Sequence, residues 1–119
     1  MIKYHIANKG AKIAEILPGA EQIKSPDDIL DLIAEISFNE CNKIMIHSQS
    51  LHPDFFDLKT RLAGEILQKF SNYRMSLAII GDFSEIKSRS LNDFIRESNN
   101  RGVISFVDST GKALEKLAI

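Results

Sequence analysis

The chain has 119 residues, one cysteine and a formal net charge of −1 from 15 basic and 16 acidic side chains. This length predicts one domain over residues 1–119, and the near balance of charge excludes a nucleic-acid binder held mainly by phosphate contacts. No segment approaches the ~20 apolar residues that span a bilayer. Because the lone Cys41 cannot form an internal disulfide, we expect a protein of the reducing cytoplasm.

The first elements are predicted from the spacing of apolar residues. Residues 2–6 alternate apolar and polar side chains, which indicates a half-buried strand. A turn over 8–10, in which Gly10 takes a positive φ, leads into a second strand over 11–17, so the two are expected to form a hairpin. Ser25 then has the features of a helix N-cap, with Pro26 in the first helical position.

Buried strands and amphipathic helices alternate through the rest of the chain. They are predicted as a helix from residue 25 to 38, a strand over 43–48, a helix over 54–70, a strand over 75–80, a helix over 88–98, a strand over 102–107 and a helix over 112–119. In the helix over 88–98, Ser90 and Asp93 are expected to form a capping box. The order β-β-α-β-α-β-α-β-α predicts an α/β fold with a mixed, mostly parallel sheet.

The order of elements is similar to the STAS fold of anti-sigma-factor antagonists and to the related SpoIIAA-like domains. The stretches "FFDLKTRLAGEILQKFSNYRMSLAIIGDFS" and "SLNDFIRESN" also resemble a bacterial family, the domain of unknown function numbered 4180. This second resemblance covers nearly the whole chain and is most specific over 53–84. It implies a fold and a bacterial host but brings no activity with it.

The sequence departs from STAS antagonists at the start of the helix after the middle strand. Those proteins carry a phosphorylatable serine there, in an Asp-Ser-Ser-Gly setting. Here Asp57 matches the aspartate, but Leu58 and Lys59 occupy the serine positions, and Thr60 is the nearest hydroxyl. We therefore expect no phosphate switch of the usual kind.

Two loops are candidates for a functional surface because they follow the carboxyl ends of predicted parallel strands, where ligands bind in α/β sheets. Residues 47–57 and 81–89 lie just past these strand ends, and the segments expected to dock a partner are 52–61 and 82–89. The candidate residues are His52, Asp54, Asp57, Lys59, Thr60, Arg61, Asp82 and Ser84. A purely structural interpretation is also open: Pro53 starts a helix, Asp54 and Asp57 favour its dipole, and the phenylalanines enter the core.

No motif for catalysis or for a cofactor is found. Cys41, His47 and His52 match no standard zinc spacing, so we interpret them as a core cysteine and two ordinary histidines. A Ser/His/Asp set drawn from Ser48 or Ser50, His52 and Asp54 lies too close along the chain for a triad and lacks a nucleophile-elbow motif. The sequence therefore predicts no catalytic residue, no metal ligand and no cofactor.

The sequence favours a non-enzymatic binding or regulatory module that docks a protein partner through these loops. The alternative is a small enzyme, or a domain for a small or apolar ligand such as a lipid, with a pocket at the strand carboxyl ends. Gly64, inside a predicted helix, disfavours that helix by ~1 kcal/mol relative to alanine, so we expect the sheet or a second subunit to approach closely there. If a second subunit approaches Gly64, the protein is a homodimer.

Overall fold

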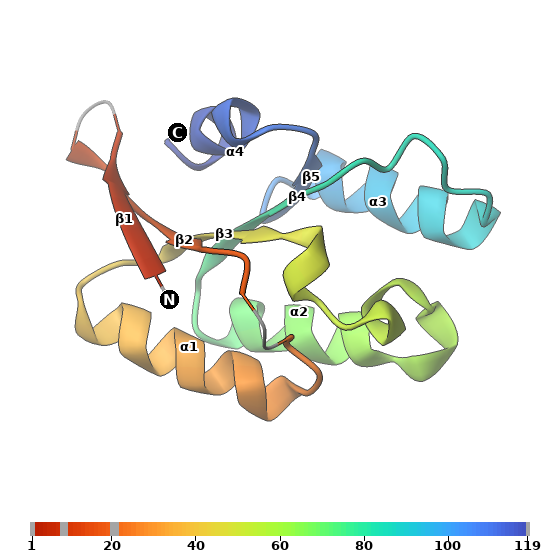
Figure 1. Ribbon diagram of the computed structural model, residues 1–119, viewed down its shortest axis with the longest axis horizontal. Helices are drawn as coiled ribbons and strands as arrows, with labels where there is room; N and C mark the ends of the chain where they lie inside the picture. The colour runs from red at the N-terminus through yellow and green to blue at the C-terminus, as the bar shows by residue number, and fades with distance from the viewer. Residues whose placement is uncertain (1, 8–9, 20–21, 119) are drawn as a thin grey trace.

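The strands lie in one sheet in the order β1-β2-β3-β4-β5 (Figure 1). The computed structural model describes residues 2–7, 10–19 and 22–118. Its elements in chain order are β1 (Ile2–Ile6), β2 (Lys12–Ile16), α1 (Pro26–Phe38), β3 (Lys43–His47), the short 3-10 helices η2 (Ser48–Ser50), η3 (Pro53–Phe56) and η4 (Leu58–Thr60), α2 (Leu62–Asn72), β4 (Ser76–Ile80), α3 (Arg89–Arg101), β5 (Ile104–Val107) and α4 (Thr110–Leu117). β1 pairs antiparallel with β2, and β2 to β5 pair in parallel. The α/β class and the mixed, mostly parallel sheet are confirmed.

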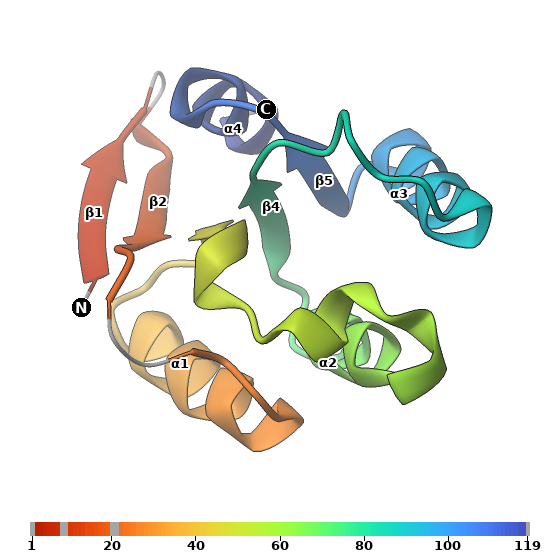
Figure 2. The ribbon, with the colours of Figure 1, turned by 45° about the vertical axis from the view of Figure 1, so that its right-hand side comes forward.

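Helices cover both faces of the sheet (Figures 1 and 2). Helices α1 and α2 lie on one face and α4 lies on the other, while α3 packs beside β5. Successive side chains of β2 point to opposite faces of the sheet. Ala14 and Ile16 join the hydrophobic cluster under α1 and α2, whereas Ile13 joins the cluster under α4. The loops that follow β2, β3 and β4 lie at the carboxyl ends of these parallel strands.

The predicted N-terminal hairpin is present. Gly10 has φ +78°, the left-handed conformation expected of it, and its N–H donates to Ala7 O at 3.1 Å. The other predicted turn residues, 8 and 9, lie outside the described part of the chain.

Capping residues fix the helix starts, and one was predicted wrongly. Ser25 caps α1, since its hydroxyl accepts from Asp28 N at 3.3 Å, as the sequence indicates. The cap of α3 is Ser88 and not Ser90: the Ser88 hydroxyl accepts from Leu91 N at 3.2 Å, which leaves Ser90 inside the helix. The chain is still extended at Ser88, which is the backbone state that an N-cap requires.

The outer edge of β5 is closed by a side chain of α3. Asn99 Oδ1 accepts from Phe106 N at 2.6 Å, and Asn99 Nδ2 donates to Phe106 O at 3.3 Å. The carboxamide thus satisfies two of the backbone groups on the outer edge of β5 that a sixth strand would otherwise use.

The helix predicted over 54–70 begins later, at Leu62. The segment before it forms η3 and η4, because side chains there bind nearby backbone groups and offer an alternative to the helical ladder. Phe55 is nevertheless buried together with Leu62, Ile66 and Phe70 of α2. Leu58 is only partly buried, so the predicted apolar stripe is interrupted at η4.

Gly64 lies in the first turn of α2 and is exposed. A Cβ placed on it would meet nothing within 4 Å. The expectation that the sheet approaches Gly64 is therefore wrong, since the apolar side of α2 that faces the sheet is formed by its neighbours, including Ala63.

Candidate functional site

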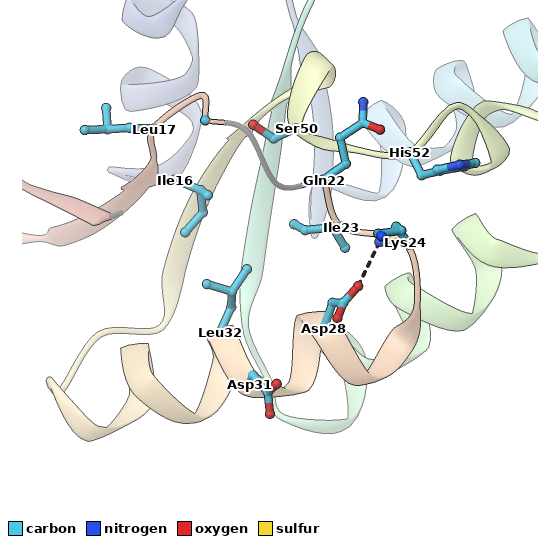
Figure 3. Close-up of a pocket in the computed structure, with 11 residues that line it drawn as sticks. Ile16, Leu17, Gln22, Ile23, Lys24, Asp28, Asp31, Leu32, Ser50 and His52 are labelled. Carbon is cyan, nitrogen blue, oxygen red and sulfur yellow. Dashed lines mark hydrogen bonds between the residues drawn. The ribbon is translucent and has the colours of Figure 1, made fainter.

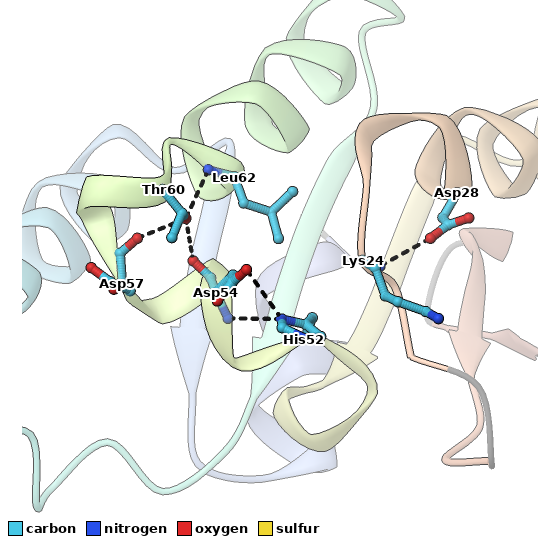
Figure 4. Close-up of polar contacts among 7 residues, drawn as sticks. All are labelled: Lys24, Asp28, His52, Asp54, Asp57, Thr60 and Leu62. Carbon is cyan, nitrogen blue, oxygen red and sulfur yellow. Dashed lines mark hydrogen bonds and ion pairs between the residues drawn. The ribbon is translucent and has the colours of Figure 1, made fainter.

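The loop from His52 to Arg61 is fixed by its own side chains (Figure 4). His52 Nδ1 accepts from Asp54 N at 3.1 Å, and Asp57 Oδ1 accepts from Lys59 N at 3.2 Å. Because Nδ1 of His52 is an acceptor, Nε2 carries the proton in the neutral ring. The Asp54 carboxylate lies 3.6 Å from the same Nδ1, so a protonated ring would form an ion pair with it.

Thr60 is the centre of this loop. Its Oγ1 lies 2.6 Å from Asp54 O and 2.8 Å from Asp57 O, to which it donates, and it accepts from Leu62 N at 3.2 Å. One hydroxyl thereby joins η3, η4 and the start of α2. Thr60 holds the loop in place and does not present a free nucleophile.

Lys59 and Arg61 lie on this fixed loop, and both are exposed. Neither side chain forms an ion pair with a carboxylate among the residues that the structure describes. Arg61 also has φ +65°. Glu40 and Arg74 share that conformation, and each follows the end of a helix, where a left-handed residue is common. Arg61 likewise follows the end of a helix, since it is the left-handed C-cap of η4 and its N–H donates to Leu58 O, and it also directly precedes α2.

Asp82 and Ser84 form a compact turn after β4. Asp82 Oδ1 accepts from the Ser84 hydroxyl at 2.6 Å and from Ser84 N at 3.0 Å. The hydrogen bond from the hydroxyl and then that from the backbone lower the pKa of the Asp82 carboxyl from its ordinary value. Asp82 is therefore a carboxylate that shapes its own turn.

The two loops are neighbours. Gly81 lies against Ser48, because a Cβ on Gly81 would come within 2.5 Å of Ser48 Oγ. The rings of Phe56 and Phe83 are 6.2 Å apart between centroids, and both are half-buried. In the described residues, no hydrogen bond or ion pair joins the polar side chains of one loop to those of the other. The eight predicted residues thus form two polar groups on either side of a small aromatic patch.

A cluster that the sequence interpretation missed lies on the α4 face of the sheet. Glu15 on β2 accepts at 2.7 Å from Nε2 of His5 on β1 and at 2.7 Å from Nε2 of His47 on β3. Glu15 is 7% exposed. Burial acts to raise the pKa of this carboxyl, but the hydrogen bonds from His47 and His5 outweigh it and the pKa lies below its ordinary value.

A signal for this cluster was present in the sequence. Glu15 is an acid inside an otherwise apolar strand, and an unpaired buried carboxylate is unfavourable, so a partner was to be expected. His5 lies on the same side of the predicted hairpin, one residue before the strand ends at Ile6. Finding His47 required the strand order, because its strand becomes the neighbour of β2 only through the crossover.

A hollow of about 1010 Å³ lies at the carboxyl ends of β2 and β3 (Figure 3). Its apolar lining includes Ile16, Ile23 and Leu32, and Ser50 also lines it. The Ser50 hydroxyl is buried and makes no hydrogen bond to any described residue. An unsatisfied buried hydroxyl is destabilising, and this oxygen is covered from solvent. The polar side chains that also line the hollow are those of Gln22, Lys24, Asp28, Asp31 and His52.

The remaining candidates show no site geometry. Cys41 is buried, and its thiol lies 3.3 Å from Lys12 O, to which it donates. Over residues 2–7, 10–19 and 22–118, no group of three or more His, Cys, Asp or Glu side chains is arranged to hold a metal ion. No helix within those same residues is long and apolar enough to cross a membrane.

The family model described as "Domain of unknown function (DUF4180)" matches residues 8–117. Neither the curated proteins nor the solved structures include a match to the chain. The match covers both candidate loops and the hollow at Ser50, and it includes Glu15 and His47 of the buried cluster but not His5.

Proposed function

Because the chain belongs to the DUF4180 family, whose description names no activity, we propose from its surface that it is a non-enzymatic, cytoplasmic regulatory module with a STAS-like or SpoIIAA-like fold that docks a protein partner. The docking surface comprises the loop 52–61, the turn 82–84 and the aromatic patch between them.

One observation carries this proposal: two unpaired cations, Lys59 and Arg61, stand on a loop that is already fixed from within. A fixed loop loses little conformational entropy on binding, so its contacts contribute more of their energy to affinity. Phe56 and Phe83 supply a half-buried apolar centre beside these charges. A shallow apolar patch with a charged rim is typical of protein interfaces.

The electrostatics of this surface favour a partner with carboxylates around an apolar anchor. A carboxylate oxygen of Asp57 caps η4 and the Asp54 carboxylate lies 3.6 Å from His52 Nδ1, whereas the charged groups of Lys59 and Arg61 have no ion-pair partner among the described residues. The cations are therefore the groups available for recognition, and complementary charge would speed and orient the encounter.

The proposal is tested by photo-crosslinking in the host, with a photoreactive amino acid at position 59. The matched control carries it at Lys116, an exposed cation near the end of α4 on the opposite face of the sheet. We expect one discrete protein adduct from position 59 and none of that mass from position 116. The same adducts from both positions, or none from position 59, would overturn the proposal.

A second candidate function rests on the Ser50 hydroxyl. The hollow around it would bind a small ligand with an aliphatic part against Ile16 and Leu32 and a polar group at Ser50. Native mass spectrometry of the chain purified from its host tests this function. It predicts a small-molecule adduct on the wild-type chain that Ser50→Ala loses, and the bare mass of the wild-type chain argues against it.

A further inference from the structure

A second hollow lies over the outward face of α2. It measures about 680 Å³ and extends from Pro26 at the start of α1 to Phe94 on α3. Its lining is formed by Pro26, Leu58, Arg61, Gly64, Glu65, Gln68, Lys69 and Phe94. Leu58 and Arg61 also belong to the loop before α2, so this hollow continues the proposed docking surface.

Gly64 forms part of the floor of this hollow. Nothing lies within 4 Å of the position that its Cβ would take, and its φ is not in the left-handed region. No group of the described chain therefore requires glycine here, although glycine disfavours a helix relative to alanine. A partner whose backbone approaches α2 closely would require it, since only glycine leaves the helix surface without a side chain.

The charged side chains around the hollow favour an acidic occupant. Arg61 and Lys69 stand eight positions apart, about 12 Å along the helix axis at 1.5 Å per residue. Neither has an ion-pair partner in the described part of the chain, and Glu65 is the acid between them. A second copy of this face would bring an excess of like charges together, whereas an acidic segment would be attracted.

The hydrogen bonding of the α2 backbone indicates which secondary structure the acidic segment of the partner would have. The N–H and C=O groups of a helix are bonded within it, so an extended strand would find no main-chain partners there. An amphipathic helix needs only side-chain packing, and helices approach each other closely where one of them presents glycine. We propose that the hollow over α2 receives an amphipathic α-helix of the docked partner, which crosses α2 at Gly64 and directs carboxylates to Arg61 and Lys69. This inference rests on the proposed function and names the kind of partner.

Two glycine variants separate folding from docking. Gly64→Ala removes a helix-disfavouring residue from open space and would raise the melting temperature by about 2–5 °C. Gly111→Ala is the matched control: Gly111 also lies in the first turn of an exposed helix, α4, and its nearest contact for a Cβ is an ordinary 3.9 Å. We expect both variants to be more stable and only Gly64→Ala to lose docking.

The partner segment is identified with a photoreactive amino acid at position 68, in the hollow, compared with position 59, on the loop. The segment mapped from position 68 is then synthesised as a peptide, and its affinity for the purified chain is measured. We expect an acidic sequence with apolar residues three and four apart, and a Kd for Gly64→Leu at least about tenfold weaker than for wild type, because the leucine fills the site of approach.

The outcomes distinguish this inference from the proposed function. Adducts from position 59 but not from position 68 would leave the docking surface standing and overturn the helix site. Equal peptide affinity for wild type and Gly64→Leu, or a mapped segment without carboxylates, would also overturn it. No adduct from either position overturns both proposals.

Discussion

The Glu15 carboxylate lies 2.7 Å from Nε2 of His47, on the neighbouring parallel strand. His5 binds the other carboxylate oxygen from the antiparallel side, so one buried acid joins three consecutive strands. The hairpin is thereby tied to the parallel part of the sheet by side chains as well as by the backbone ladder.

This arrangement predicts a stability change in acid. The pKa of Glu15 is lowered in the folded chain from an ordinary value of 4.5, so its contribution to the free energy of unfolding is present above pH 4.5 and is lost as pH falls through the folded value below 4.5. Urea denaturation between pH 7 and pH 3 measures it. Glu15→Gln should lower the free energy of unfolding by about 1–3 kcal/mol at pH 7 and flatten the acid limb.

Glu35→Gln is the control, because Glu35 is an exposed glutamate on α1. It should change neither the stability at pH 7 nor the acid limb by more than about 0.5 kcal/mol. Equal effects from the two variants would show that the cluster around Glu15 contributes nothing to stability.

Thr60 should carry no phosphate in the host. Its hydroxyl donates to Asp54 O and Asp57 O and accepts from Leu62 N, and a phosphate there would break these bonds and place its charge beside Asp57. Intact-protein mass spectrometry of the chain from its host should give the unmodified mass over 54–61. A stoichiometric phosphate on Thr60 would contradict this.

Charge reversal at the loop should separate stability from docking. Lys59→Glu with Arg61→Glu replaces cations by anions next to the amino end of α2, where anions are favoured by ~0.3–1 kcal/mol each. A thermal melt should therefore show equal or slightly higher stability, while the crosslinked adduct formed from a photoreactive amino acid at position 68 weakens. The control is Lys112→Glu with Lys116→Glu on α4, which should retain the adduct. If the folded Lys59→Glu, Arg61→Glu variant docks like wild type, the interface lies elsewhere.

Arg61→Gly should stabilise the chain. A non-glycine residue in the left-handed conformation is strained by ~1–2 kcal/mol, and glycine would relieve that strain. Because glycine also makes the unfolded chain more flexible, the net increase in the free energy of unfolding should be roughly 0.5–1 kcal/mol. Arg61→Ala removes the same charge but keeps the strain, so it serves as the comparison in a denaturation experiment. If both variants have the same stability, the backbone at Arg61 is not strained.

The strands and the caps of α1 could be predicted because their signals are local. Ser25 and Asp28 act within one helical turn, and the apolar runs of β3 and β4 are buried as their composition indicates. The start of α2 was missed because His52, Asp57 and Thr60 each bind backbone groups within a few residues. Such bonds compete with the helix but leave no periodic pattern.

The candidate surface was found only in part, for a related reason. The predicted ends of the strands indicated both loops. The contact between Phe56 and Phe83 could not be predicted in this way, because these residues lie 27 positions apart in the sequence. The bond from His47 to Glu15 likewise depends on two strands that meet only in the folded sheet. A sequence pattern reports neighbours along the chain, and these contacts are neighbours in space.

Asn99 has a consequence for how chains meet one another at high concentration. By occupying the N–H and C=O groups of Phe106, it removes two of the groups that β5 would offer to a foreign strand, whereas β1 is the other edge strand of the sheet. That edge is five residues long and carries an exposed lysine, Lys3. A foreign strand would have to displace the Asn99 carboxamide before it could pair along the whole of β5, which disfavours growth of the sheet on that side.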